Sequence, residues 1–418
     1  MKLYEGVRKG KRCNVNNVLV VDAHLKASLA VIRSLGKRNI NVTAGSEMKS
    51  AIGLYSKYCS KKCLYPNPRL YPHAFIDYLL SLVKNKTYDC IISTDTYTTF
   101  LLVRHKNLFG EYTRITPPDF QVFMNAFDKK LLLKTAIKNG VNCPITYFDD
   151  NADELAASIQ KYPVVIKPAR RHGIKIAICH TPLELKTTHR EMSKKYGPCL
   201  VQEYIPNGGE FGVYTLFDGD SEPLALAVQK RIRSLNSYGG ISTLRKTVKN
   251  DELVNIAFYL LKTIRWSGVA MVEFRVDEQD GIPKLMEINP RFWGSLQLSI
   301  LSGVDFPYLL YKLIMNEEQT STLSFKEGIQ CRWLLGDVTR LIRCPNKLKT
   351  MLNLFQPTFH DDVISIKDPK PMIASIFSPW FYPEEGPRDD NIVIRNKIEA
   401  IQQLIPDGED YENPTHLS

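Results

Sequence analysis

From residue 15 to residue 116, short apolar runs alternate with stretches of helical spacing. Val18–Val21, Ile40–Thr43 and Cys90–Ser93 have the length and composition of buried strands. Between the first two runs, Ala27–Leu35 places its apolar residues at helical spacing and is followed by a glycine that can end a helix. This β-α-β order predicts a doubly wound, mostly parallel sheet.

The chain of 418 residues exceeds the roughly 250–300 residues that one hydrophobic core supports, so we expect two or three domains. Pro117-Pro118 ends the alternating region and marks the first boundary. A helix is expected at Asp128–Asn139, after which strands dominate. We therefore expect a basic arm (1–14), a first domain (15–118), a second domain (119–330) with lobes 119–199 and 200–330, and a proline-rich C-terminal extension (331–418).

Composition excludes several classes of protein. Apolar residues make up 44% and charged residues 24%, as in ordinary globular enzymes, which argues against a mainly disordered or fibrous chain. The net charge of +11 suits anionic partners but selects none of them. The sequence contains no basic helix with interleaved aromatic residues, so it gives no indication of nucleic-acid binding. We expect no transmembrane segment and no signal peptide, and the nine scattered cysteines favour a reducing cytoplasm.

A hairpin with an unusual set of polar residues is expected between residues 269 and 291. Two apolar runs flank the turn signal Asp280-Gly281. If the turn is centred on residue 280, Glu273 faces Glu287 across the ladder, and Asn289 shares the face of Glu287. Two carboxylates and an amide oxygen then converge on one patch.

These groups indicate a metal site. Carboxylates this close repel each other unless a cation lies between them. Hard oxygen ligands suit Mg²⁺, which commonly joins one or two carboxylates with substrate phosphates. Arg291 follows at once and can hold a phosphoryl oxygen. The alternative is a solvated hairpin, but Phe292-Trp293-Gly294 is too apolar for a loose tip.

Two further segments are weaker signals. Lys167 ends an apolar strand, where its ammonium needs an anion, and the basic loop 170–173 after it can cover phosphates. A lysine reaching out to solvent explains the same residues. The hinge Gln202–Ile205 can bond adenine through its backbone, and Glu210 can hold ribose hydroxyls. An ordinary strand and turn explain these residues equally well.

Taken in order, these segments resemble the ATP-grasp superfamily over roughly residues 15–380. The resemblance rests on Asp128-Lys129, Val165-Ile166-Lys167, Gln202-Glu203-Tyr204-Ile205, Glu210, Glu273 and Glu287-Ile288-Asn289-Pro290-Arg291. It implies a fold of classes α/β and α+β, with a Rossmann-like parallel-sheet domain, a two-lobed ATP-grasp domain and a C-terminal extension. The stretches Glu287–Leu296 and Gly303–Pro307 look most like carboxylate–amine ligases of the carbamoyl-phosphate-synthase-like group, which are linked to cell-surface polymer or peptide-like metabolite synthesis.

The resemblance also implies a role for each matching residue. Lys129 and Lys167 should contact the phosphates of ATP, Gln202, Glu203, Tyr204 and Ile205 the adenine, and Glu210 the ribose. Lys230 should reach the nucleotide or an acyl phosphate. Glu273, Glu287 and Asn289 should bind Mg²⁺, with Mn²⁺ as an alternative, and Arg291 should stabilise the transferring phosphoryl group.

The implied enzyme is a cytoplasmic ligase that phosphorylates a carboxylate with ATP, lets an amine attack the acyl phosphate, and releases ADP and phosphate. Acid–thiol ligation and carboxylation are alternatives, although no biotinyl-type domain is visible. A nucleotide-binding sensor or scaffold without turnover is another, because loop 170–173 is basic where the family has small residues.

Both substrates should be small molecules. The cations Arg231, Arg233, Arg245 and Lys246 flank the segment 239–243 and suggest that one substrate is acidic, unless they serve the ATP phosphates. The sequence is compatible with a homodimer and with a monomer.

Overall fold

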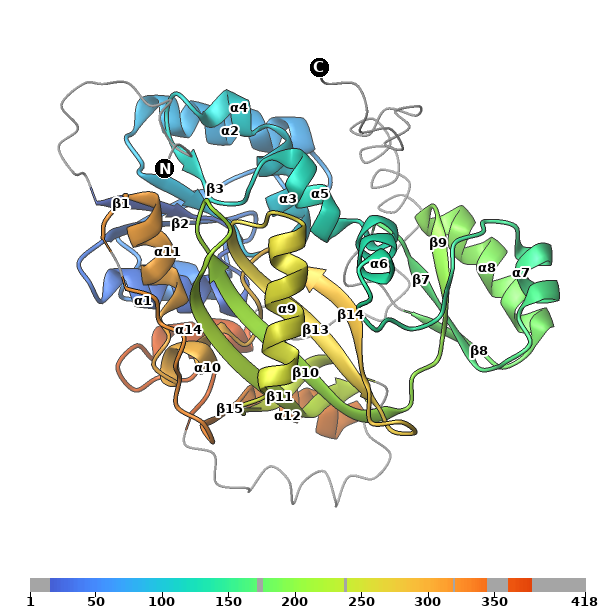
Figure 1. The fold of residues 1–418 in the computed structure, drawn as a ribbon. Coiled ribbons are helices and arrows are strands. Elements are labelled where there is room, and N and C mark those ends of the chain that lie inside the picture. Colours follow the sequence, from blue (N-terminus) through green and yellow to red (C-terminus); the bar gives the residue numbers. More distant parts are fainter. Residues whose placement is uncertain (1–15, 171–175, 237–238, 319, 344–359, 378–418) are drawn as a thin grey trace.

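The computed structural model describes residues 16–170, 176–236, 239–318, 320–343 and 360–377. The basic arm 1–14, all but the first residue of the loop 170–173, and the extension beyond 377 lie outside these ranges. The described residues form three sheets of five, four and six strands (Figure 1).

The N-terminal sheet has the strand order β3-β2-β1-β4-β5, and every neighbouring pair is parallel. The prediction of a parallel, doubly wound sheet is therefore confirmed. Residues Val18, Leu19 and Val20 are fully buried, as expected for a central parallel strand with both faces covered. Its strands are β1 (Asn17–Val20), β2 (Asn41–Ser46), β3 (Lys61–Leu64), β4 (Cys90–Ile92) and β5 (Arg114–Ile115).

The helices of this region follow the spacing of its apolar residues. The predicted helix 27–35 is α1, and Gly36 is its last residue. Asp95 caps α3 by accepting hydrogen bonds from the amides of Tyr97 and Thr98, which fixes where that helix starts. The helical segments are α1 (Lys26–Gly36), η1 (Ile52–Tyr55), α2 (Pro72–Asn85), α3 (Thr96–Arg104), α4 (Lys106–Phe109) and α5 (Phe120–Phe127).

A small lobe with a core of its own follows helix α6 (Lys129–Lys138). Its sheet has the order β6-β9-β7-β8, and the ladders are antiparallel. Figure 1 shows this lobe set apart from the rest, with α7 and α8 on its outer side. Its elements are β6 (Thr146–Tyr147), α7 (Ala152–Ser158), β7 (Val164–Pro168), β8 (Ala177–Cys179), α8 (Pro182–Tyr196) and β9 (Cys199–Glu203).

The third and largest sheet has the order β14-β13-β10-β11-β12-β15. Its strands pair antiparallel throughout. The strands are β10 (Asn207–Phe217), β11 (Pro223–Asn236), β12 (Gly239–Thr247), β13 (Gly268–Asp277), β14 (Pro283–Asn289) and β15 (Gln330–Arg332). Helices α9 (Asp251–Thr263), α10 (Leu296–Leu301), α11 (Phe306–Ile314) and α12 (Leu334–Arg343) accompany them.

The registers sort the side chains of this sheet onto two faces. Glu210 stands opposite Arg231 on one side and Arg275 on the other, and Glu273 stands opposite Glu287. We call the face that carries these five residues the polar face. The apolar face carries Phe211, Val213, Val272, Phe274 and Ile288, and helix α9 covers it within one large core (Figure 1).

The N-terminal sheet and the large sheet share their cores. One buried cluster joins Leu19 and Phe75 to Val213 and Val272. A second joins α1 to Trp293 and to the end of the polar face at Tyr214 and Met271. These two sheets therefore form one body, against which the small lobe stands.

The described part of the C-terminal region is anchored to this body. Strand β15 pairs with β12, and helix α14 (Lys370–Ile376) packs on η1. Asp362 is buried between Lys26 and Arg245, and Asp368 pairs with Arg33. No helix among the described residues has the length and apolarity needed to cross a membrane.

Candidate active site

The β13–β14 hairpin brings the predicted metal-binding residues together. Glu273 stands directly opposite Glu287, which confirms the predicted pairing. Asn289 lies on the same face, because its Nδ2 donates a hydrogen bond to Glu287 Oε1 at 2.9 Å. Nearer the turn, Phe274 pairs with Leu285, so Met286 is an extra residue that forms a β-bulge. The bulge sets Glu287 opposite Glu273, which would otherwise face Met286.

The two facing carboxylates repel each other. Burial first, and the neighbouring Glu287 second, raise the pKa of Glu273 to about 7. A cation between these groups would remove the repulsion. The donor set fits Mg²⁺ or Mn²⁺, since both carboxylates and the amide of Asn289 supply hard oxygens. The described ranges contain no group of three or more His, Cys, Asp or Glu residues placed to hold a metal ion. The remaining oxygens around the ion would therefore come from a bound substrate or from water.

Two lysines approach the polar face from outside the large sheet. Lys129 is the first residue of α6, and its Nζ lies 3.7 Å from Glu287 Oε2. Asp128 caps α6 and also binds Arg170, while the amide of Lys129 donates to Ala169 O, so α6 begins against the end of β7. Burial lowers the pKa of Lys129 and lowers that of Lys167, on β7, to about 8, although Glu287 opposes both shifts.

Glu210, the predicted ribose ligand, lies between two arginines. Arg231 Nη1 is 2.8 Å from Glu210 Oε2, and Arg275 binds the other carboxylate oxygen. Burial by itself would raise the pKa of Glu210, but Arg231 and Arg275 bring it below its ordinary value. Arg231 Nη2 also lies 3.8 Å from Glu273 Oε2, so Arg231 connects the predicted ribose end of the site with its metal end.

Lys230 was expected to reach the nucleotide or an acyl phosphate, and the register places it on the face opposite Glu273 and Glu287. It pairs with Phe211 and Lys246 on the apolar face, and its Nζ lies 5.3 Å from the centre of the Phe211 ring. The basic residue of β11 that faces the carboxylates is Arg231. Side chains alternate along a strand, so neighbouring residues 230 and 231 lie on opposite faces of the sheet.

The predicted adenine hinge joins the small lobe to β10. Gln202 is buried and donates to Thr146 Oγ1, and Glu203 accepts from the amide of Ile145. The amide of Tyr204 donates to Pro163 O, and Ile205 O accepts from Arg275. The segment is thus held at both ends, and its contact with adenine stays a prediction.

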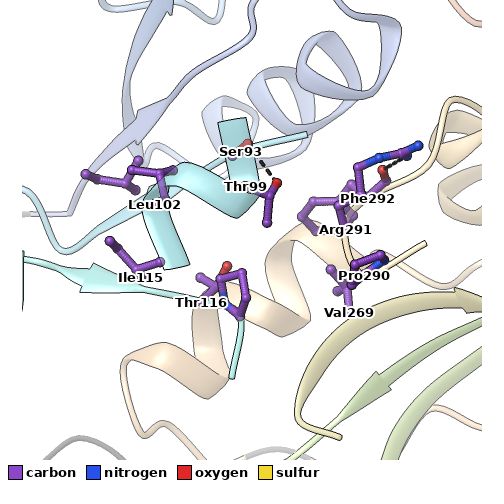
Figure 2. Close-up of a pocket in the computed structure, with 11 residues that line it drawn as sticks. Ser93, Thr99, Leu102, Ile115, Thr116, Val269, Pro290, Arg291 and Phe292 are labelled. Atoms are coloured by element: carbon purple, nitrogen blue, oxygen red, sulfur yellow. Dashed lines mark hydrogen bonds between the residues drawn. The ribbon is translucent and has the colours of Figure 1, made fainter. Parts of the chain in front are cut away.

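Arg291 lies where the large sheet meets the N-terminal sheet. Its guanidinium donates to Asn289 Oδ1 at 3.0 Å, to Phe292 O at 2.7 Å and to Thr96 Oγ1 at 2.5 Å. Burial lowers the pKa of Arg291, against the influence of Asp95 and Glu287. Figure 2 shows a pocket beside it, lined from the N-terminal region by Ser93, Thr99, Ile115 and Thr116, and from β13 and the segment after β14 by Val269, Pro290, Arg291 and Phe292.

Three of the four cations that suggested an acidic substrate pair with carboxylates of the protein. Arg233 pairs with Asp337, Arg245 with Asp362, and Arg231 with Glu210 and Glu273. These cations therefore have carboxylate partners within the protein. Lys246 lies opposite Lys230 on the apolar face.

Sequence reasoning missed Arg275 and Thr96, and it named Arg231 only among the cations for an acidic substrate or the ATP phosphates. Arg275 could have been found, because it lies two residues from Glu273 and so shares its face. Arg231 needed the register between β10 and β11. Thr96 carries no local signal, since its partner lies 195 residues away in the chain.

Comparisons with known proteins agree with this architecture. Residues 195–336 match a family model described as ATP-grasp in the biosynthetic pathway with Ter operon. No curated protein matches the chain. Among solved structures, biotin carboxylase from Campylobacter jejuni in a β-γ-ATP complex matches with a TM-score of 0.62 and 16% identity, over 75% of this chain and 74% of that one.

Two other similar structures are also enzymes by their names. L-amino acid ligase from Bacillus licheniformis has a TM-score of 0.57 and 16% identity, over 71% of this chain and 74% of that one. N5-carboxyaminoimidazole synthetase from Staphylococcus aureus, complexed with ADP, has a TM-score of 0.62 and 14% identity, over 81% and 85%. At such identities the likeness is one of fold.

Proposed function

We propose that this chain is a member of the ATP-grasp superfamily and an ATP- and Mg²⁺-dependent ligase that joins a carboxylate to an amine and forms ADP and phosphate. The observation that carries the proposal is the pairing of Glu273 with Glu287, with Asn289 and Arg291 beside them and Lys129 against them. Such a cluster of hard oxygens and cations suits a nucleoside triphosphate with its metal.

ATP would lie between the small lobe and the polar face. The hinge 202–205 would hold adenine and Glu210 the ribose, while Lys129 and Lys167 would contact the phosphates. Glu210 keeps its charge at neutral pH because two arginines lower its pKa. This orientation directs the γ-phosphate toward Glu273 and Glu287.

Glu273, Glu287 and Asn289 would hold Mg²⁺. Asn289 Oδ1 accepts one hydrogen bond from Arg291, and its second lone pair can ligate a metal. Bound there, the ion would neutralise charge on the terminal phosphates and on the departing ADP.

The reaction would be transfer of the γ-phosphoryl group to the substrate carboxylate. Arg291 would hold the transferring group, and the oxygen–phosphorus bond to ADP would break as the bond to the carboxylate forms. The amine would then displace phosphate from the acyl phosphate and lose a proton. Positioning and charge neutralisation suffice for such a transfer, so no covalent nucleophile of the protein is required.

The similar proteins support this class of reaction. The L-amino acid ligase is named as a ligase, and the matching family model is described as part of a biosynthetic pathway. We propose a biosynthetic role here also, in the assembly of a cell-surface polymer or a peptide-like metabolite.

A nucleotide-binding protein without turnover is the second candidate, and the basic residue Arg170 favours it. Arg170 pairs with the Asp128 carboxylate at the start of α6, beside the predicted phosphate contacts. Such a pair could hold the phosphates without supporting their transfer.

The two candidates differ in product formation. MgATP should be incubated with pairs from a panel of acids and amines, and ADP, AMP, phosphate and pyrophosphate should be measured. ADP and phosphate formed only with a matching pair, with a hydroxamate when hydroxylamine replaces the amine, would support the ligase. Binding of MgATP without product from any pair would favour the second candidate. AMP and pyrophosphate would contradict γ-phosphoryl transfer.

A further inference from the structure

A hydrogen bond connects the N-terminal domain with the candidate active site. Thr96, the first residue of α3, accepts a bond from Arg291 Nε, and the oxygen and nitrogen lie 2.5 Å apart. Thr96 is buried, so water competes little for its hydroxyl. Arg291 itself follows β14 of the large sheet, so this bond connects α3 with the end of that sheet.

The contacts of Arg291 fix the plane of its guanidinium. A guanidinium carries five N–H groups in one plane. Thr96, Asn289 and the carbonyl of Phe292 each accept one of them, and these three bonds involve all three nitrogens. Two N–H groups have no partner among the described residues. Two is the number that a bidentate contact with a phosphoryl group requires.

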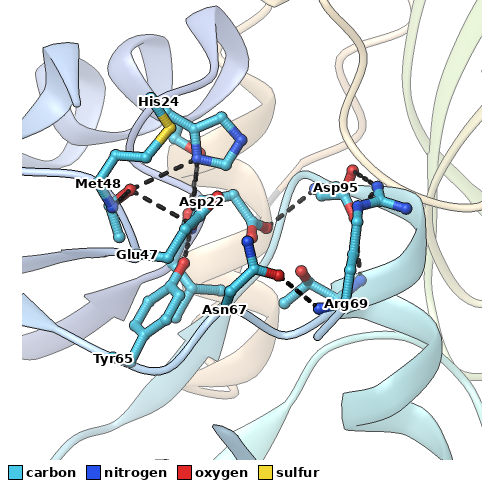
Figure 3. A network of polar contacts seen from close by, with 12 residues as sticks. Asp22, His24, Glu47, Met48, Tyr65, Asn67, Arg69 and Asp95 are labelled. Carbon is cyan, nitrogen blue, oxygen red and sulfur yellow. Dashed lines mark hydrogen bonds and ion pairs between the residues drawn. The ribbon is translucent and has the colours of Figure 1, made fainter. Parts of the chain in front are cut away.

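Thr96 is itself held rigidly. The buried carboxylate of Asp22, at the end of β1, accepts bonds from Ser93 Oγ and from the amides of Thr94 and Asp95. Asp95 then caps α3 and forms two bonds with Arg69. Figure 3 shows this network, in which Asp95 lies between Asp22 and Arg69. The first turn of α3 therefore presents the Thr96 hydroxyl from a fixed position.

We propose that Thr96 is a positioning residue for Arg291, and that its hydroxyl holds the guanidinium in the orientation in which the two remaining N–H groups bind the transferring phosphoryl group. The proposal rests on the proposed function. It gives the N-terminal domain a part in phosphoryl transfer, although none of its described residues belongs to the predicted nucleotide or metal ligands.

Two properties distinguish positioning from simple attachment of one domain to the other. A positioning residue affects the transferred phosphoryl group and leaves the binding of ADP unchanged. It also acts only through Arg291, so its effect should vanish once Arg291 no longer offers a planar fork of donors.

The test uses the full chain and two probes, MgADP alone and MgADP with aluminium fluoride, which imitates the transferring phosphoryl group. Thr96→Val removes the hydroxyl at nearly constant shape, and Thr96→Ser retains it. Thr98→Val is a matched control, since Thr98 is buried in the same turn and its hydroxyl has no hydrogen bond to a described residue. Affinities are measured by calorimetry, and folding by thermal unfolding.

We expect aluminium fluoride to tighten MgADP binding in the wild type, in Thr96→Ser and in Thr98→Val. In Thr96→Val this gain should fall about tenfold, the usual effect of losing a hydrogen bond to a charged group, while MgADP alone binds as before. In an Arg291→Lys background, Thr96→Val should have no further effect. If Thr96→Val unfolds, Thr96→Ala removes the same hydroxyl and leaves more room.

The possible failures are distinguishable. An undiminished gain in Thr96→Val, or a further loss when Thr96→Val is added to Arg291→Lys, would overturn the positioning role while the proposed function stands. Absence of MgADP binding in the folded wild type would overturn the proposed function and this inference with it.

Discussion

The two faces of the large sheet are built from the same strands but have opposite characters. On the apolar face, Val213, Val272 and Ile288 are fully buried under α9. On the polar face, Glu273 stands opposite Glu287, and burial first and the facing carboxylate second raise the pKa of Glu273. The comparison indicates that the apolar face stabilises the fold, whereas the polar face keeps two like charges side by side, where a bound cation would neutralise them.

The largest expected effect is the loss of turnover when a carboxylate of the polar face is replaced. Glu287→Gln removes one charged ligand and should lower ADP formation about a thousandfold, as loss of a charge-stabilising group commonly does. Stability should change little, because repulsion of Glu273 is relieved. Steady-state kinetics and thermal unfolding would measure both. Loss of the cooperative unfolding transition together with activity would show that Glu287 is structural.

The neighbouring residue on the apolar face should behave in the opposite way. Ile288→Ala leaves a cavity in the core beneath α9 and should lower the free energy of unfolding by about 2–5 kcal/mol. The variant that remains folded should bind MgATP with wild-type affinity. Urea denaturation and calorimetry test this, and a weakened affinity with intact stability would erase the contrast between the faces.

Lys167 sharpens the comparison from the side of the small lobe. Lys167→Ala should weaken MgATP binding about tenfold or more, because a partly buried ammonium forms strong bonds with phosphate. Mg²⁺ should strengthen ATP binding in the wild type. Thermal shifts with ATP, with and without Mg²⁺, measure both effects, and an unchanged shift in the variant would remove Lys167 from the site.

The smallest effect is expected from Lys230→Ala, which alters the apolar face at a partly exposed position. Turnover should stay within about twofold and stability within about 0.5 kcal/mol of the wild type. Arg231→Ala, one residue away, removes the partner of Glu210 and should weaken nucleotide binding measurably. Equal effects of the two variants on turnover and nucleotide binding would mean that the face on which each residue lies does not determine its role.

The hairpin shows how far the sequence could predict the site. Its turn signal and apolar runs were enough to pair Glu273 with Glu287. The prediction assumed a ladder centred on residue 280, whereas the pairs nearest the turn, such as Phe274 with Leu285, are centred half a residue earlier. The bulge at Met286 restores the register, and no local pattern indicates it. The pairing was therefore right while the detailed path of β14 was not.

Contacts between distant segments could not be predicted in the same way. Within one strand, alternation tells which residues share a face but not which face is buried, so Lys230 and Arg231 were indistinguishable. The parallel sheet was predictable because each β-α-β unit is local. The Thr96–Arg291 bond depends on how the N-terminal sheet packs on the large sheet. That packing is determined by many buried contacts between distant segments of the chain.

The anchoring of Asp362 has a consequence for how the protein is made. Its carboxylate pairs with Lys26, 336 residues earlier in the chain, and with Arg245; Asp362 and Arg245 are buried, and Lys26 is 13% exposed. During synthesis both cations leave the ribosome long before their partner does. A buried charge without its partner destabilises a fold by about 3–5 kcal/mol. We therefore expect the body to close fully around Lys26 and Arg245 only after residue 362 has emerged.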